Sequence, residues 1–417
     1  MPLASIAADE LEATVARLFD CDQSLINDPW PVFAALREQK PILRVGPLVA
    51  VSRYDDVKQV LRDPETYSSV RAKGTRELAR RAELDDEGLA KFQALTAFES
   101  RGMTQNDDPE HARIRRFVNA SFSAASIATL RDQVEALVRE LLDDIDARGQ
   151  HEFDLVGEFA YQLPFRVVCR LLGVEDYDLG TLRAWQAEIR KGIGTMYANL
   201  DEAYEAMLNY RSYVLDVIRR HRAHPAAATD LFGRLVSTDD EGTFLDDEDL
   251  IAIFITMMTS GNTNDVISNA VVSLQRHPDQ RDLLRDRPEL MRNAVEEFFR
   301  YSPSVYNIHR SATCDTELNG FRIRAGETVR LLLASANHDP ARFEDPETMD
   351  VTRKNARQHI GLGFGIHTCL GQWLARQEAE LAIAELLRRY PDLRITEQVD
   401  FRRNFTIHGP DRLMVAV

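Results

Sequence analysis

The chain has 417 residues, more than one compact core usually holds, so two domains and one large composite domain are both compatible with its length. Its 51 basic and 67 acidic side chains leave a net charge of −16. That charge argues against general nucleic-acid binding, because phosphate contacts need concentrated Lys and Arg. The four scattered cysteines include no C-x-x-C pair, which argues against a disulfide framework or a structural zinc site.

The N-terminal residues 1–20 lack the basic stretch and the apolar core of a secretory signal. No apolar run in the chain reaches the roughly 18 residues that a membrane span needs. Together with the small number of cysteines, these observations predict a cytoplasmic protein that is not attached to a membrane.

Helical patterns dominate the first half of the chain. Residues 28–39 predict a short amphipathic helix, and residues 42–57 predict a β-hairpin that turns near Gly46 and then enters a helix. Residues 67–103 are less regular, and we interpret them as a candidate mobile segment. Helical patterns alternate with short breaks from residue 108 to residue 236.

The second half begins with the longest apolar helical pattern, over residues 251–278. Another helix is predicted over 293–303, followed by short strands with turn glycines over 318–337. Residues 370–390 predict an amphipathic helix, and residues 401–417 predict a final hairpin. No repeat, low-complexity linker or clear domain boundary interrupts the chain.

A glycine-rich segment precedes the last predicted helix. Residues 359–371 spell HIGLGFGIHTCLG and place four glycines around Cys369. The dipole and the free N–H groups of a helix start favour a thiolate, and glycines let the backbone approach whatever the sulfur binds. From the residues alone, a nucleophilic cysteine with His367 as its base and a metal thiolate both remain open. A nucleotide loop is not favoured, because G-x-G-x-x-G spacing and a P-loop Lys are missing.

The stretch GLGFGIHTCLG resembles the haem-binding loop of the cytochromes P450, the haem-thiolate monooxygenases, whose pattern is F-x-x-G-x-x-x-C-x-G. Gly365, Cys369 and Gly371 match that pattern, while Leu362 stands where the family has its Phe. The resemblance implies that Cys369 is the axial ligand of the haem iron and that Leu362, Gly363, Gly365 and Gly371 lie against the haem. The departure at Leu362 bears on the haem potential and not on ligation.

Three more segments extend the resemblance. His111 and Arg115 are four residues apart and share a helix face, which by itself is a common solvated basic surface. In the family these positions, with those of Arg310 and His367, bind the two haem propionates, which need cationic hydrogen-bond donors when buried.

The segment EEFFR places Glu297 and Arg300 three residues apart. Alone, such a pair is usually an exposed helix contact worth roughly 0.3–0.5 kcal/mol. The resemblance matches it to the E-x-x-R helix of the family and implies Arg353 as the third member of a buried scaffold without a catalytic role.

The long apolar helix is interrupted by TSGNTND, where a glycine costs about 1 kcal/mol and polar side chains need partners. A wet cavity and a satisfied polar network explain this interruption equally well. The segment resembles the oxygen-binding helix of the family, A/G-G-x-D/E-T-S/T. A gapless alignment puts Gly261 at the acid and Asn262 at the alcohol, followed by Thr263. A second register puts Thr263 at the acid and Asn264 at the alcohol, and both registers lack the usual pair.

The resemblance covers nearly the whole chain and implies a mainly α (α+β) cytochrome P450 fold, a helical triangular prism with small β-sheets, over a single domain 1–417. It implies haem b (iron protoporphyrin IX) as cofactor and a small, mostly apolar substrate. Electrons would come from a ferredoxin or flavodoxin and its NAD(P)H-dependent reductase. The docking surface would include Arg113, Arg116 and Arg357, which are equally explained as solvated charge.

The missing acid–alcohol pair leaves the mechanism open. Protons would reach the oxygen through ordered water, Thr263 or a polar group of the substrate, or the enzyme would use hydrogen peroxide, which carries its own protons. A haem-thiolate protein that does not oxygenate (an isomerase, a coupling or dehydration enzyme, or a gas sensor) is the second class, and a haem-free helical scaffold is the third. The sequence does not identify the substrate, and by analogy its pocket would draw on residues 92–103, Met257, Met258, 304–308, Ile407 and His408.

Overall fold

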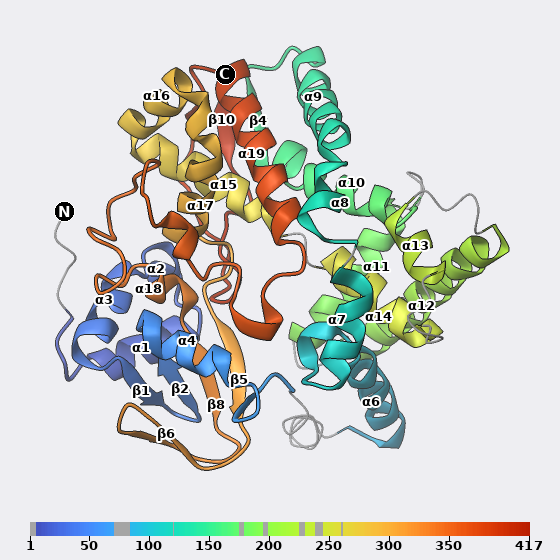
Figure 1. The fold of residues 1–417 in the computed structure, drawn as a ribbon, viewed down its shortest axis with the longest axis vertical. Coiled ribbons are helices and arrows are strands. Elements are labelled where there is room, and N and C mark those ends of the chain that lie inside the picture. Colours follow the sequence, from blue (N-terminus) through green and yellow to red (C-terminus); the bar gives the residue numbers. More distant parts are fainter. Residues whose placement is uncertain are drawn as a thin grey trace. The chain divides into compact units, whose positions relative to one another are not determined.

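The structure is a computed structural model that describes residues 6–70, 84–119, 121–174, 179–194, 199–224, 230–237, 245–259 and 262–417. As the sequence predicts, helices predominate and the sheets are small (Figure 1). Contacts divide the chain into two compact units. The first unit comprises residues 1–68, 124–164 and 262–417, and the second comprises 69–123 and 165–261. None of the described helices is both long enough and apolar enough to span a bilayer.

The main sheet of the first unit has five strands in the order β1 (Ile42–Val45), β2 (Leu48–Val51), β8 (Thr328–Leu331), β5 (Ile308–Ala312) and β3 (Tyr67–Ser68). The neighbours β2 and β8 are parallel, and the other pairs are antiparallel. Alternate residues of β8 are buried, as expected for strands with one face on a core.

The predicted hairpin over residues 42–57 is confirmed: β1 and β2 pair across a turn in which Gly46 has φ +55°, a left-handed conformation that glycine adopts without strain. The predicted strands with turn glycines are confirmed up to residue 331: they form a small hairpin of β6 (Thr316–Leu318) and β7 (Phe321–Ile323), followed by β8 of the main sheet. The end of the predicted segment is instead the short helix α18 (Leu333–Ala336).

The prediction of a C-terminal hairpin over residues 401–417 is only partly right. Phe401 and Pro410 form an antiparallel bridge. The last strand, β10 (Met414–Ala416), instead pairs with β4 (Glu152–Asp154) and β9 (Arg394–Ile395) in a three-stranded sheet. The partner strand β4 is distant in sequence, so no local pattern indicated it.

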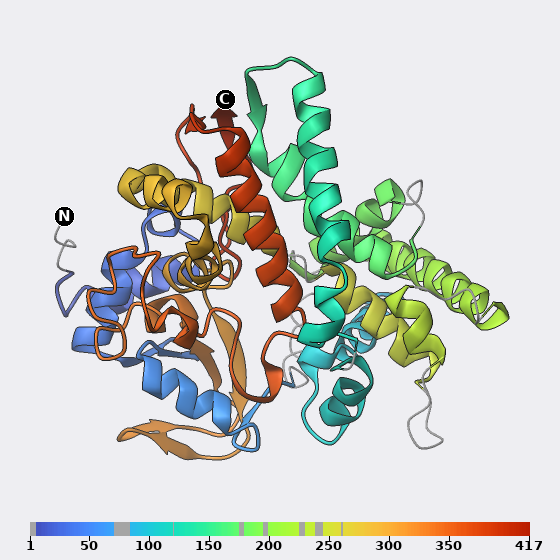
Figure 2. The same cartoon turned by 45° about the horizontal axis from the view of Figure 1, so that its top comes forward.

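Helix α19 (Gln372–Arg389) is central to the helical part of the first unit. It packs against α9 (Arg131–Ala147), α15 (Thr263–Arg276), α16 (Pro278–Asp286) and α17 (Met291–Tyr301). Figure 2 shows α9 and α19 running side by side. The helix that follows Cys369 is therefore covered by neighbours on several sides.

Three further helices belong to the first unit. These are α1 (Leu11–Phe19), α3 (Trp30–Gln39) and α4 (Tyr54–Arg62), and α3 confirms the helix predicted over 28–39. Apolar residues of α4, β2 and β8 form one buried cluster.

Helix α12 (Leu200–Ala223) organises the second unit. It packs against α6 (Asp86–Ser100), α11 (Leu179–Gly194), α13 (Leu231–Ser237) and α14 (Asp247–Thr259). Further described helices with residues in this unit are α7 (Glu110–Asn119) and most of α10 (Gln162–Leu171).

The prediction that residues 67–103 are irregular is wrong over α6, a helix of 15 residues. Among the described side chains of α6, Phe92 and Leu95 are buried. So few buried apolar positions give a weak helical period, and α6 depends on packing against α12. Residues 71–83 of the same segment lie outside the described residues.

The long apolar pattern over 251–278 forms two helices, α14 and α15. Residues 260 and 261 lie outside the described residues, and Asn262 precedes α15 in a non-helical conformation with φ −76° and ψ 9°. The end of α14 and the start of α15 therefore flank the interruption that the sequence shows at TSGN.

Candidate active site

Cys369 closes a tight turn between a short 3₁₀ helix (Gly365–His367) and α19. Its backbone N–H donates to the carbonyl oxygen of Leu362 over 2.9 Å. The N–H of Thr368 donates to the carbonyl oxygen of Gly365 over 3.1 Å, and its hydroxyl donates to the same oxygen over 2.8 Å. These bonds hold the half-buried Cys369 at the start of α19.

The glycines of this loop are needed for close packing. Gly363 and Gly365 have φ +75° and +76°, where any other residue is strained. A Cβ on Gly365 would lie 2.5 Å from the carbonyl oxygen of Leu61 in α4, and one on Gly361 would meet the carbonyl oxygen of Phe299 in α17. The loop therefore rests directly on the backbone of two helices.

The donor set around Cys369 limits which metal it could hold. Among the described residues, no group of three or more His, Cys, Asp or Glu side chains could hold a metal ion. A bare ion needs several protein ligands, whereas haem iron brings four ring nitrogens and needs one axial thiolate. Leu362, Phe364, Ile366 and Leu370 in the same loop are all partly exposed and apolar. The residues therefore fit a flat apolar group such as haem.

Two predicted propionate ligands lie in the first unit with Cys369. Arg310 is a nearly buried residue of β5, and its Nη1 donates to the carbonyl oxygen of His309 over 2.7 Å. His367 is half-buried and ends the 3₁₀ helix before Cys369.

The other two predicted propionate ligands, His111 and Arg115, lie one turn apart on α7 in the second unit. The His111 ring is buried, with Nδ1 3.3 Å from Oδ1 of Asp108. Burial lowers the pKa of His111, while Asp108 opposes that shift. Arg115 is half-buried, and its Nε donates to Oδ1 of Asn119 over 2.9 Å.

The start of α15 contains the predicted oxygen-binding residues. Asn262 is half-buried and caps the helix without a side-chain hydrogen bond, and Thr263 is the first helical residue and is buried. Gly261 lies outside the described residues. The two predicted residues that the structure describes therefore offer an amide and a hydroxyl, and neither group is an acid.

Sequence reasoning missed a buried acid two residues beyond Thr263. Asp265 accepts a hydrogen bond from Nδ2 of Asn264 over 2.9 Å, and Nη2 of Arg402 lies 3.3 Å from its Oδ1. Burial raises the pKa of Asp265 to about 6, although Arg402 acts to lower it. A Cβ on Gly409 would collide with this carboxyl, so the C-terminal turn lies directly against it.

The predicted scaffold of Glu297, Arg300 and Arg353 is confirmed. Arg300 donates to both carboxylate oxygens of Glu297 over 2.7 Å, and Nε of Arg353 donates to Oε1 over 3.2 Å. Glu297 and Arg300 are fully buried, and Arg300 also donates to three backbone carbonyl oxygens. The exposed pair that the sequence alone favours is thus replaced by a fully desolvated bidentate pair.

A second carboxylate cluster next to this scaffold was missed. Glu296 lies 3.0 Å from Nε2 of His359 and accepts from Nε of Arg376 over 2.9 Å and Nε of Arg357 over 3.3 Å. Burial acts to raise the pKa of Glu296, but these hydrogen bonds outweigh it and bring the pKa to about 2. Two sequence features could have indicated this cluster: the second glutamate in EEFFR, and His359 at the start of the glycine-rich segment.

Comparison with known proteins decides the family. The family described as cytochrome P450 matches residues 195–406. Cytochrome P450 107B1 of Saccharopolyspora erythraea is 32% identical over 415 residues, which covers 96% of this chain and 98% of that protein. The chain belongs to the cytochrome P450 family.

Other P450 relatives agree along the whole length. The mycinamicin IV hydroxylase/epoxidase of Micromonospora griseorubida is 35% identical and covers 92% of this chain and 94% of that enzyme. The P450 PksS of Bacillus subtilis 168 has a similar structure, with a TM-score of 0.83 at 27% identity, covering 95% of this chain and 98% of that chain. These similarities confirm the predicted fold class.

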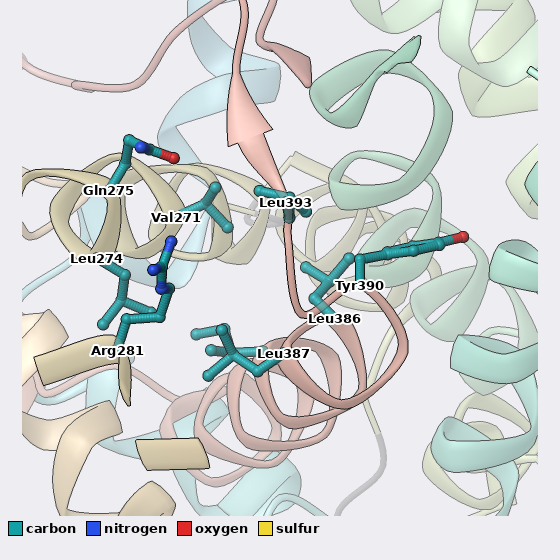
Figure 3. A pocket seen from close by; sticks show the side chains of 9 residues that line it. Val271, Leu274, Gln275, Arg281, Leu386, Leu387, Tyr390 and Leu393 are labelled. Carbon is teal, nitrogen blue, oxygen red and sulfur yellow. The ribbon is translucent and has the colours of Figure 1, made fainter. Parts of the chain in front are cut away.

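As a P450, this chain is a monooxygenase that binds haem b. A small hollow is lined by residues of α15, of α16 and of the C-terminal half of α19 (Figure 3). Val271, Leu274, Leu386 and Leu387 give it apolar walls, and its volume of about 20 Å³ is close to what one water molecule needs. It is too small to hold a substrate.

The predicted substrate-contacting residues fall in both units. In the first unit, the His408 ring stacks on Tyr306 and on Phe401, each with ring centroids 4.1 Å apart, and its Nε2 lies 3.1 Å from the carbonyl oxygen of Ile26. Burial lowers the pKa of His408 to about 3, so the ring is neutral at ordinary pH. The structure thus gives His408 a packing role that the sequence did not indicate.

Proposed function

We propose that this chain is a haem-thiolate monooxygenase in which Cys369 is the axial ligand of the haem iron. The observation that carries the proposal is the closed turn at Cys369, a single half-buried sulfur at a helix start with partly exposed apolar residues around it. The helix dipole and the nearby backbone N–H groups stabilise the thiolate form. Leu362, Gly363 and Gly371 belong to the same loop and would lie against the ring.

The haem carboxylates would be held by cationic donors. Arg310 and His367 in the first unit, and His111 and Arg115 in the second, are of the types that bind buried carboxylates with charge-assisted hydrogen bonds. Bound haem supplies the dioxygen chemistry of the reaction, and the protein binds, orients and supplies protons. We also propose that residues 1–417 act together as one P450 domain, because the relatives match along nearly the whole chain.

On the oxygen side, Asn262 and Thr263 would bind the oxygen or ordered water through hydrogen bonds. Gly261 has no side chain and Asn262 cannot give up a proton, so the hydroxyl of Thr263 is the group in this trio that can pass one on. Proton delivery would use Thr263 together with ordered water or a polar group of the substrate.

The substrate would be a small, mostly apolar organic molecule. Relatives of similar identity are named as a mycinamicin IV hydroxylase/epoxidase, a vitamin D(3) 25-hydroxylase and a 20-oxo-5-O-mycaminosyltylactone 23-monooxygenase. All three names describe the addition of oxygen, which supports hydroxylation as the reaction. The substrates that they name differ, so they favour no single substrate.

Electrons would come from a ferredoxin or flavodoxin and its NAD(P)H-dependent reductase, in the cytoplasm. Of the arginines proposed for docking, Arg113 is already bound to Asp249 over 2.8 Å and to Glu110 over 2.6 Å. Arg357 remains 70% exposed although it contacts Glu296, so it is the better candidate of these two.

The test begins with the haem-loaded protein. The reduced carbon monoxide complex should show the absorption band of a thiolate ligand, and Cys369→Ser should lose that band. Cys314→Ser is the matched control, because Cys314 is exposed. An unchanged band in Cys369→Ser would overturn the assignment of the ligand.

The second part of the test separates the open mechanisms. Substrate should be hydroxylated with NADH, reductase and ferredoxin at least as efficiently as with hydrogen peroxide. Product that forms with peroxide but not with ferredoxin would support the peroxide-using alternative, which the amide at Asn262 favours. A converted substrate without an added oxygen atom would support a non-oxygenating enzyme.

A further inference from the structure

A buried histidine begins the glycine-rich segment that leads to Cys369. The His359 side chain is 2% exposed, and its ring stacks on that of Phe299 in α17, with ring centroids 5.5 Å apart. Its Nδ1 accepts a hydrogen bond from the backbone N–H of Gly361 over 3.1 Å. Because a backbone N–H can only donate, Nδ1 carries no proton, and the proton of the neutral ring lies on Nε2.

Glu296 fixes this state of the ring. Nε2 of His359 lies 3.0 Å from Oε2 of Glu296, so its N–H donates to the carboxylate. Burial lowers the pKa of His359, although Glu296 opposes that shift. Arg376 donates to both oxygens of Glu296, over 2.9 and 3.2 Å, which holds the carboxylate in place. A carboxylate, an imidazole and a backbone N–H therefore form one chain of hydrogen bonds.

The amide held in this way lies one residue before an anchor of the cysteine. Leu362, whose carbonyl oxygen accepts from the N–H of Cys369 over 2.9 Å, directly follows Gly361. The preceding amide, of Ile360, donates to Oδ1 of Asn337 over 2.8 Å. Side chains therefore hold two consecutive amides of the glycine-rich segment just before the residue that binds the cysteine backbone.

The adjacent Glu297 scaffold serves other parts of the chain. Its two arginines, Arg300 and Arg353, donate to backbone carbonyl oxygens between residues 337 and 348. The chain of hydrogen bonds from Glu296 instead ends in the glycine-rich segment. Two neighbouring glutamates of α17 therefore connect to two different segments.

We propose that Glu296 and His359 are positioning residues, which hold the glycine-rich segment in the shape in which Cys369 can ligate haem iron. The proposal rests on the proposed function. Each residue acts through another group: Glu296 orients the ring, and the ring holds the amide of Gly361. Replacing groups that orient a metal ligand from outside the coordination sphere typically changes metal affinity or activity roughly 10- to 100-fold.

The first experiment measures the segment itself and does not depend on activity. Hydrogen exchange of the holoenzyme, followed by mass spectrometry, reports the amides of residues 359–371. His359→Leu removes the acceptor and should speed exchange there roughly 2- to 10-fold, as for the loss of one hydrogen bond. His359→Asn should restore much of the protection, because an Asn oxygen accepts from the N–H two residues further on.

A matched control changes a carboxylate that faces another buried histidine. Glu347→Gln alters the partner of His338 and should leave the exchange of residues 359–371 unchanged. Exchange in His359→Leu that equals the wild type would overturn the proposal. So would equal exchange in His359→Leu and His359→Asn, because the acceptor atom would then have no role.

The second experiment tests whether Glu296 acts through His359. Glu296→Gln should speed exchange of the segment in the wild type but add little in His359→Leu, where the chain is already broken. Equal increases in both backgrounds would overturn the proposal. Nitrogen-15 NMR should find the ring proton of His359 on Nε2, with the resonance assigned by its loss in His359→Asn. A proton on Nδ1 would contradict the chain.

The haem-loaded variants connect the segment to ligation. His359→Leu should lose haem to added apomyoglobin roughly 10-fold faster than the wild type, and His359→Asn should be intermediate. If Cys369→Ser keeps the thiolate band of the carbon monoxide complex, the proposed function fails and the positioning role falls with it. If Cys369→Ser loses the band while His359→Leu keeps its haem as the wild type does, only the positioning role is overturned.

Discussion

Helices α17 and α19 lie against one another in the first unit, and both bury glutamates, but in opposite electrostatic surroundings. On α17, Glu297 meets Arg300 and Arg353, and Glu296 meets Arg376 and His359. On α19, Glu378 is buried as deeply and meets no cation among the described residues, with Thr263 as a polar neighbour.

The difference shows how one residue type acquires two roles. A carboxylate that receives several charged donors stays ionised and acts as a fixed connection between chain segments. A carboxyl group that is buried without them keeps its proton and becomes an acid at neutral pH. The roles of Glu297 and Glu378 therefore follow from their partners and not from their depth of burial.

The largest effect should come from breaking the scaffold on α17. Glu297→Gln should cost about 3–5 kcal/mol of the free energy of unfolding, because Arg300 and Arg353 would stay buried without a counter-charge. Urea unfolding of the holoenzyme measures this cost. Glu385→Gln is the control: its partner Arg388 is 70% exposed, and the loss should be about 0–1 kcal/mol. Equal losses of unfolding free energy in the two variants would show that the buried scaffold contributes no more stability than an exposed ion pair.

The next largest effect concerns the unpaired acid on α19. Burial raises the pKa of Glu378 from 4.5 to about 8. Between these values the folded protein keeps a proton that the unfolded chain releases. The free energy of unfolding should therefore fall as pH rises, by up to about 1.4 kcal/mol per pH unit. Glu378→Gln should remove this fall, so unfolding curves over that pH range compare the two proteins. A wild-type slope that survives in Glu378→Gln would assign the proton to another group.

The stability that Glu296 contributes should depend on pH in the opposite direction, and over a narrower pH range. Its pKa is lowered from 4.5 to about 2, because the hydrogen bonds from His359 and Arg376 outweigh burial. Its contribution is complete above pH 4.5 and is lost as pH falls toward 2. Glu296→Gln should therefore be less stable than the wild type at neutral pH, and the gap should close in acid. Acid unfolding followed by fluorescence tests this, and a gap that widens in acid would contradict it.

Much of the α17 side of this comparison was predictable from sequence. The spacing of Glu297 and Arg300 places them on one helix face, and the family pattern added Arg353 from more than 50 residues away. The turns at Gly46 and Gly320 were equally accessible, because turn glycines mark positions that need a left-handed backbone. These features depend on local spacing or on a motif.

The α19 side was predictable only in part. Glu378 stands four residues after Leu374 and three before Leu381, so the helical period places it on the apolar stripe of α19. In the structure α19 is surrounded by several helices, and Glu378 is buried. The period does not report whether a neighbouring element brings a cation to a buried carboxyl group, and that decides its protonation state.

The smallest effect should come from removing the hydroxyl of Thr263, which forms a hydrogen bond with Glu378. Thr263→Val keeps the size of the side chain but removes the hydroxyl, whose hydrogen bond lowers the pKa of Glu378. That pKa should therefore rise above 8, and the infrared carbonyl band of protonated Glu378 should disappear at a higher pH than in the wild type. The cost in unfolding free energy should be only about 1 kcal/mol, as for one neutral hydrogen bond. Thr129→Val, which removes an exposed hydroxyl that donates to the Ser126 carbonyl oxygen, should leave the band unmoved. A band that titrates at the same pH in Thr263→Val would mean that Thr263 does not form a hydrogen bond with Glu378.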